Sequence, residues 1–173
     1  MKKRRPPLDP EALERLALHY AGRYATTRSK LRSYLLRKVR ERGWEGDAPV
    51  EVEGLVERCA GLGYVDDRAF AAQRTSSLQR RGYGKRRVEQ ALRAAGIAEE
   101  DSAEARAQAE EGAWAAAVRF ASRKRIGPFS TSAVDPVERQ KAFAAMMRAG
   151  HAPDHAGRLL AMKPGEVPEM DGA

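Results

Sequence analysis

The sequence predicts an all-α protein: an elongated, solenoid-like stack of three tandem three-helix repeats with nine short helices. Three observations lead to this fold class. The helix formers Ala, Arg, Glu and Leu dominate while β-branched residues are scarce, apolar residues recur with helical spacing, and two sequence markers repeat along the chain. Aromatic residues are only 6% of the chain, so no single core can be large.

Residues 10–63 are expected to form the first repeat. Its helix starts are typical of capped or proline-led helices and fall at Asp9-Pro10, at Thr27 or Ser29, and at Pro49. Glycines at positions 43 and 63 are expected to end the second and third helices. The side chains expected to face the core are Leu13, Leu16, Ala17, Tyr20, Leu31, Leu35, Val39, Val52, Leu55, Val56, Cys59 and Leu62.

Residues 64–112 and 113–162 are expected to form the second and third repeats. The second has a capped helix after Asp66, a helix after Gly84, and a polar helix over 99–111. In the third, a loop over 127–136 follows the first helix, and prolines 136 and 153 open the other two. The side chains expected to face inward are Phe70, Ala71, Val88, Leu92, Trp114, Val118, Phe120, Phe143, Met146, Met147, Leu159 and Leu160.

Two markers define the repeat period. A pair of apolar residues four apart, followed four residues later by glycine, occurs three times and ends at Gly43, Gly96 and Gly150. An aromatic residue followed by small residues recurs every 50 residues, at Tyr20, Phe70 and Phe120. One such unit has too few large apolar residues for a core of its own, so we expect neighbouring repeats to stack end to end.

The two ends of the chain, residues 1–9 and 163–173, are charged and rich in proline. We expect a disordered basic arm and a disordered tail. No apolar run approaches the roughly 18 residues of a membrane span, and the basic N-terminus is not followed by the apolar stretch of a signal peptide. We therefore expect a soluble, cytoplasmic protein. We also expect a monomer, because no apolar patch is evident.

The sequence contains no phosphate-binding glycine loop and no nucleophile elbow, so we expect neither an enzyme nor a cofactor. The single cysteine, Cys59, falls on an apolar helix face and is expected in the core. His151 and His155 are four residues apart, but Pro153 lies between them at a helix start. We expect surface histidines there rather than metal ligands.

Asp66-Asp67 is the one acidic pair that could serve chemistry, as a metal or acid–base site. The structural interpretation is that Asp66 caps a helix and Asp67 lies in its first turn, where negative charge meets the positive end of the helix dipole. No third carboxylate or histidine stands beside the pair in sequence, which favours the structural role.

Charge is segregated into blocks within a net charge of +8. Residues 1–44 carry a net charge of +9 and residues 74–93 a net charge of +6, whereas residues 45–69 and 97–118 each carry −5. If the repeats stack in register, their basic faces form a stripe that suits a phosphate backbone or an acidic protein groove. The alternative is that these residues only solvate helix faces.

The residues expected in this basic stripe are Arg28, Arg32, Arg37, Lys38, Arg40, Arg80, Arg81, Lys85, Arg86, Arg87, Arg123, Lys124 and Arg125. Segment 80–87 has the strongest pattern, because its glycines permit close backbone approach and Tyr83 offers a stacking face. It is equally compatible with a plain interhelical turn. No recognition-helix pattern is evident, which disfavours sequence-specific DNA readout.

Several motifs stand in a characteristic order. They are Arg28-Ser29 with Leu31, Leu35 and Gly43; Leu62-Gly63-Tyr64-Val65-Asp66-Asp67-Arg68-Ala69-Phe70-Ala71; and Arg81-Gly82-x-Gly84 with Leu92 and Gly96-Ile97. Together they resemble the RecX family of bacterial recombinase regulators over about residues 12–162. The second motif is the most specific. Met147-Arg148-Ala149-Gly150-His151 departs from the more apolar Leu-x-x-Arg-Gly-Phe of the family.

The resemblance implies a fold of tandem three-helix repeats and a negative regulator of RecA recombinase. The regulator would lodge in the groove of the RecA–DNA filament, block its extension, promote its disassembly, and lower ATP hydrolysis, strand exchange and coprotease activity. A helical repeat protein that binds DNA or RNA directly, without RecA, is the alternative.

For the motif residues we expect structural roles. Asp66 and Asp67 belong to a helix start, and Tyr64 and Phe70 are expected to pack between the first and second repeats. Helix ends and tight turns are expected at the motif glycines, Gly43, Gly82, Gly84 and Gly96.

Overall fold

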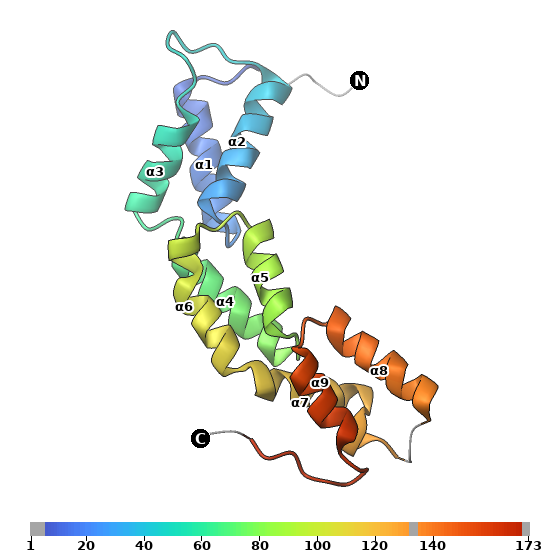
Figure 1. The fold of residues 1–173 in the computed structure, drawn as a ribbon. Helices are drawn as coiled ribbons and strands as arrows, with labels where there is room; N and C mark the ends of the chain where they lie inside the picture. Colours follow the sequence, from blue (N-terminus) through green and yellow to red (C-terminus); the bar gives the residue numbers. More distant parts are fainter. Residues whose placement is uncertain (1–5, 132–134, 171–173) are drawn as a thin grey trace. The chain divides into compact units, whose positions relative to one another are not determined.

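Figure 1 shows a chain built from helices. The structure is a computed structural model that describes residues 6–131 and 135–170. That part of the chain contains nine α-helices, a 3-10 helix at Gly127–Phe129 and no strand, which confirms the all-α class. The helices are α1 (Pro10–Arg23), α2 (Arg28–Arg42), α3 (Val52–Gly61), α4 (Asp67–Arg80), α5 (Lys85–Ala94), α6 (Glu99–Glu111), α7 (Ala113–Lys124), α8 (Pro136–Arg148) and α9 (Pro153–Ala161).

The chain divides into two compact units. Among the described residues, 6–70 and 95–101 form the first unit, and 71–94, 102–131 and 135–170 form the second. These boundaries do not coincide with the predicted repeat boundaries at residues 63 and 112. The division into three-helix repeats 10–63, 64–112 and 113–162 therefore stays a prediction.

In the first unit, α1, α2 and α3 pack around a small apolar core (Figure 1). Two of the three predicted helix starts are confirmed, those of α1 and α2. Asp9 accepts a hydrogen bond from the backbone N–H of Ala12 at 2.7 Å, and Thr27, rather than Ser29, accepts one from the N–H of Lys30 at 3.2 Å. Fully buried side chains of this core include Leu8, Leu31, Leu35 and Val56, and Cys59 is buried beside them as predicted.

The start and end of α3 differ from the prediction. The helix begins at Val52 rather than at Pro49, because residues 43–50 form a loop in which the indole N–H of Trp44 donates to the carbonyl of Ala48 at 2.8 Å. It ends at Gly61. Leu62, predicted to face the core, lies beyond the last turn and is 72% exposed.

The predicted N-terminal arm is too long. Its residues 1–5 lie outside the described residues, but Leu8 is fully buried. The backbone N–H of Leu8 donates to the carbonyl of Gly43, and its carbonyl accepts from the N–H of Glu45, each at 2.9 Å. Leu8 therefore belongs to the first unit, since burial of an apolar side chain and two backbone hydrogen bonds fix it there.

The second unit has an apolar core of residues from α7, α8, α9 and the segment after α7, led by Trp114, Phe120, Ile126, Met146 and Leu159. Elsewhere in the unit, α4 and α6 are joined by glutamine side chains. Gln79 donates to the carbonyl of Ala109 at 3.1 Å, and Gln108 donates to the hydroxyl of Ser76 at 2.8 Å. These bonds explain how a helix predicted to be polar, α6, is held in place.

Close backbone contact explains Gly150, one of the three glycines that end the repeated sequence marker. The N–H of Gly84 donates to the carbonyl of Ala149 at 2.9 Å, and the N–H of Arg86 donates to that of Gly150 at 3.1 Å. A Cβ on Gly84 would lie 2.3 Å from the Gly150 oxygen, and Gly150 has a φ of +90°. Only glycine fits both positions without strain. The other two glycines of the marker, Gly43 and Gly96, also have positive φ.

Three further expectations about the second unit are wrong. His151 is buried rather than on the surface, and its Nε2–H donates to the carbonyl of Gly82 at 3.1 Å. Phe143 is 36% exposed because only the Met146 side of α8 packs into the core. The described part of the tail, predicted to be disordered, contacts the folded chain. The indole N–H of Trp114 donates to the carbonyl of Glu169 at 2.7 Å. Residues 171–173 lie outside the described residues.

Candidate functional site

Most of the predicted basic residues on α2 are paired with carboxylates. Arg32 Nε lies 2.6 and 2.7 Å from the two carboxylate oxygens of Glu53, and this hydrogen bond raises the pKa of Arg32. Glu41 lies 2.7 Å from Lys38 Nζ and 4.0 Å from Arg37 Nε. Such exposed pairs add little stability, but they compensate charge that a polyanion would otherwise meet. Arg40 is exposed, and no carboxylate of the described chain pairs with it.

Asp66 and Asp67 have structural roles. Asp66 caps α4, accepting from the N–H of Ala69 at 2.9 Å. Asp67 is buried and accepts from the backbone N–H of Arg28 at 2.9 Å, so it holds the start of α2. Burial raises the pKa of the Asp67 carboxyl, while the hydrogen bond from Arg28 and the charge of its guanidinium act in the opposite direction. The Arg28 guanidinium lies 3.6 Å from Asp101, so this predicted stripe residue is also paired.

Of the two aromatic motif residues, Tyr64 differs from the expectation, and the packing role of Phe70 stays a prediction. Tyr64 is 52% exposed, because it follows Gly63 in the turn between α3 and α4 and its neighbour Val65 takes the buried position. Phe70 is half-buried, and the ammonium of Lys30 lies 4.6 Å from the centre of its ring.

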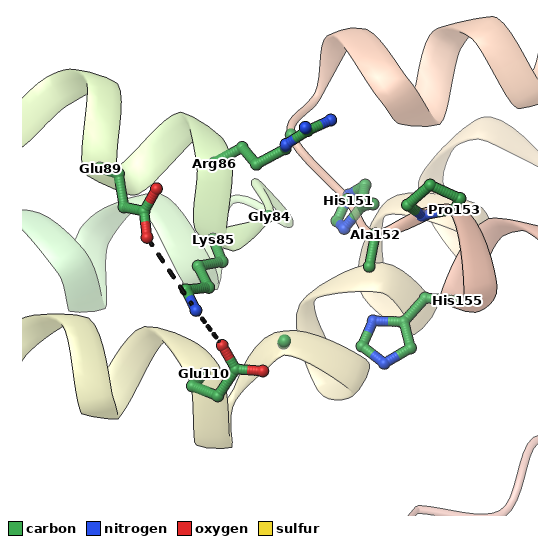
Figure 2. Close-up of a pocket in the computed structure, with 11 residues that line it drawn as sticks. Gly84, Lys85, Arg86, Glu89, Glu110, His151, Ala152, Pro153 and His155 are labelled. Atoms are coloured by element: carbon green, nitrogen blue, oxygen red, sulfur yellow. Dashed lines mark hydrogen bonds and ion pairs between the residues drawn. The ribbon is translucent and has the colours of Figure 1, made fainter.

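Lys85 is engaged by two carboxylates of the second unit. Figure 2 shows its ammonium between Glu89 and Glu110, 4.0 Å from Glu89 and hydrogen-bonded to Glu110. That hydrogen bond raises the pKa of Lys85 and lowers the pKa of Glu110. The three side chains line a cavity of about 380 Å³, in which Arg86 is directed away from Lys85 (Figure 2). Two adjacent residues of segment 80–87 thus have different electrostatic surroundings.

A second cavity of about 370 Å³ contains a cluster of unpaired arginines, and we call it the arginine cavity. Its lining residues come from α4, the α4–α5 turn and α5, and they are Arg74, Leu78, Arg81, Tyr83, Arg87, Gln90, Ala91 and Ala94. The guanidinium carbons of Arg81 and Arg87 lie 5.4 and 6.0 Å from the centre of the Tyr83 ring. Cation–π attraction of this kind holds a guanidinium near an aromatic ring.

The charge of the arginine cavity is uncompensated. Among the described residues, no carboxylate forms an ion pair with Arg74, Arg81 or Arg87. The single acidic residue in segment 74–93, Glu89, is engaged by Lys85. Three guanidinium groups thus line one cavity, and groups of this kind bind phosphate and carboxylate groups in a bidentate geometry.

The remaining predicted basic residues are exposed. Arg80 and Arg86 flank the α4–α5 turn, and Arg123, Lys124 and Arg125 lie at the end of α7, where Arg125 is the C-cap with a φ of 55°. None of the five pairs with a carboxylate of the described chain. The structure thus separates the predicted basic residues into paired ones, chiefly on α2, and unpaired ones, most of them in the second unit.

Sequence analysis missed two residues of the arginine cavity, Arg74 and Gln90. Helical spacing could have found both. Arg74 precedes Leu78 by four residues and Gln90 follows Arg87 by three, so each pair shares a helix face.

The described part of the chain consists of residues 6–131 and 135–170. No three His, Cys, Asp or Glu side chains in these ranges come together in a group that could hold a metal ion. Of the helices described, none is long and apolar enough to cross a bilayer.

Comparisons with known proteins define the class. Residues 66–105 match the second three-helix domain of RecX. The regulatory protein RecX of Myxococcus xanthus is 36% identical over 170 residues, covering 94% of this chain and 91% of that protein. The one of Agrobacterium fabrum is 30% identical over 158 residues, covering 89% and 84%.

Solved structures share the fold. The crystal structure of RecX from Lactobacillus salivarius matches with a TM-score of 0.67 at 14% identity, covering 87% of this chain and 93% of that one. Another RecX crystal structure matches with a TM-score of 0.62 at 21% identity, covering 86% and 72%. The protein therefore has the helical fold of the RecX crystal structures. On the identity and coverage of its relatives, the chain belongs to the RecX family.

Proposed function

We propose that this protein is a negative regulator of RecA recombinase. It binds in the groove of the RecA–DNA filament, where it blocks filament extension and promotes disassembly, and thereby lowers ATP hydrolysis, strand exchange and coprotease activity. Membership of the RecX family supports the partner. The observation in this chain that supports a filament surface as its target is the arginine cavity, with three uncompensated guanidinium groups.

The unpaired basic residues are the proposed contacts with the filament. They are Arg40, Arg80, Arg81, Arg86, Arg87, Arg123, Lys124 and Arg125, with Arg74 added from the structure. The paired residues Arg28, Arg32, Arg37, Lys38 and Lys85 contribute less, because a partner has to displace a carboxylate from each.

Co-sedimentation with RecA filaments assembled on single-stranded DNA tests this function. The wild-type chain should sediment with the filaments, and the double variant Arg81→Gln/Arg87→Gln should need about tenfold more protein for the same bound fraction. Arg119→Gln is the matched control, because Arg119 is an exposed cation of α7 outside the cavity. A wild-type chain that stays in the supernatant would refute the proposed function.

Direct action on nucleic acid without RecA is the second candidate. The same arginine cavity favours it, because phosphate groups suit guanidinium groups as well as carboxylates do. Sedimentation with DNA alone separates the two functions: a RecA regulator requires RecA for binding at low protein concentration, whereas a nucleic-acid-binding protein does not.

A further inference from the structure

We propose that the arginine cavity binds one nucleotide unit of a single-stranded nucleic acid, with the phosphate on the arginines and the base beside Tyr83. The inference rests on the proposed function and specifies it: within a RecA filament, this cavity touches the DNA strand rather than acidic side chains of RecA.

Uncompensated charge is the first argument. Arg74, Arg81 and Arg87 line one cavity without a carboxylate partner in the described chain, so a bound anion would meet three like charges that no protein group compensates. Glu89 does not supply that charge, because Lys85 engages it on the other cavity (Figure 2). A phosphodiester brings one negative charge with two oxygens that match the guanidinium fork.

The set of residues that line the arginine cavity is the second argument, and it favours a nucleotide over a carboxylate. Unpaired bases stack on aromatic rings and on the flat faces of guanidinium groups. Tyr83 holds the guanidinium groups of Arg81 and Arg87 within 6.0 Å of its ring centre, which places both kinds of surface side by side. Gln90 adds an amide donor and acceptor, and Leu78, Ala91 and Ala94 add apolar contact area. An acidic side chain has no ring that would use these surfaces.

The shape of the site is the third argument, and it favours a single strand over a duplex. A cavity of about 370 Å³ is within the range of pockets that hold small organic groups. A nucleotide of a single strand can turn its base into such a cavity, whereas a base in a duplex must first leave its stack.

The test is fluorescence anisotropy of a labelled oligothymidylate with the full chain, at several salt concentrations and without RecA. Arg74→Gln, Arg81→Gln and Arg87→Gln should each weaken binding by about tenfold. Each should also reduce the slope of log K against log salt, by at most the roughly 0.7 that one phosphate contact with a single strand contributes. Arg119→Gln removes the same charge from the same unit and should leave both quantities nearly unchanged.

A second pair of variants separates the aromatic contribution from a folding defect. Tyr83→Phe keeps the ring and should bind like the wild type, whereas Tyr83→Leu loses the ring and should weaken binding with an unchanged salt slope. Because Tyr83 also packs against the core of the second unit, each variant is first shown to have the wild-type helix content by circular dichroism.

Competing ligands decide the source of the nucleotide. A duplex of the same length, ATP, and a glutamate-rich peptide are each added against the labelled strand. The proposal predicts that only unlabelled single strand competes efficiently. Equal competition by ATP would make this a site for free nucleotides, and preferred competition by the acidic peptide would make it a protein-binding site; either result overturns the proposal.

The outcome is distinguishable from a failure of the proposed function. If the cavity variants lose RecA inhibition but keep wild-type affinity for oligothymidylate, the arginines contact RecA and the nucleotide proposal is wrong while the function stands. If the wild-type chain does not inhibit RecA at all, the function is wrong, whatever the oligothymidylate affinity.

Discussion

Asp67 holds the start of α2 from a position 39 residues away, and its removal gives a sharp stability prediction. Asp67 is only 4% exposed, and its Oδ1 accepts from the backbone N–H of Arg28 at 2.9 Å. The hydroxyl of Thr27 already accepts from the N–H of Lys30, two residues further on, so it does not replace Asp67 as the acceptor for Arg28. Asp67→Ala should therefore lower the free energy of unfolding by about 1–3 kcal/mol, the cost of a buried donor left without its partner. Asp67→Asn keeps an acceptor oxygen and should cost less.

The pH dependence of this effect has a definite sign. Burial raises the pKa of Asp67 above its ordinary value of 3.8, so the folded protein binds the proton more tightly than the unfolded chain. The part of this contribution that depends on pH, the tighter proton binding of the folded state, is fully present below pH 3.8 and is lost as the pH rises through the raised pKa of the folded state, whereas the hydrogen bond from the N–H of Arg28 remains. Relative to Asp67→Asn, the wild type should therefore lose stability over this interval and stay constant above it.

Urea unfolding followed by circular dichroism measures both effects, at several pH values from 3.5 to 7. Asp47→Ala is the matched control, because Asp47 is an exposed carboxylate of the same unit and its loss should change stability by less than about 0.5 kcal/mol. An Asp67→Ala variant as stable as the control would refute the role of Asp67 at α2.

Three further substitutions test other parts of the fold by the same unfolding measurement. Phe70→Ala should cost about 2 kcal/mol, roughly half the value for a fully buried ring, because Phe70 is half-buried; a loss below about 1 kcal/mol would identify Phe70 as a contact residue instead. Gly150→Ala should cost more than about 2 kcal/mol, because its φ is +90° and the new Cβ would lie 2.4 Å from the Arg87 nitrogen. Gly22→Ala, in open space on α1, is the control and should be neutral or stabilising. Equal effects of the two substitutions would contradict the close contact at Gly150. Leu8→Ala should lower the free energy of unfolding by about 2–5 kcal/mol. A variant as stable as the wild type would show that Leu8 belongs to a disordered arm instead.

Local chemistry explains which parts of the fold could be predicted from sequence. Asp9 with Pro10 specifies a helix start by hydrogen bonding within three residues, and the helix predicted over 99–111 has these bounds in the structure. The start of α3 could not be predicted. It depends on the loop around Trp44, which is fixed by backbone hydrogen bonds to Leu8, more than 30 residues earlier. The burial of His151 likewise depends on Gly82, 69 residues away.

In the candidate site, too, local features could be predicted from sequence, and features that depend on distant residues could not. Arg81, Tyr83 and Arg87 were identified from sequence because they stand in one short basic segment. Which arginines stay unpaired was not predictable, because the carboxylates come from distant positions: Glu53 engages Arg32 across 21 residues. Sequence analysis counts charges, whereas the tertiary structure decides which of them are compensated.

The central claim is regulation of RecA, and its most direct test is RecA ATP hydrolysis on single-stranded DNA. The protein is titrated at substoichiometric ratios to RecA, with a parallel measurement of its binding to the same DNA without RecA. Inhibition well below one molecule per RecA, at concentrations that leave bare DNA unbound, is the predicted result. Inhibition only at amounts that coat the DNA would contradict the account and identify a nucleic-acid-binding protein instead.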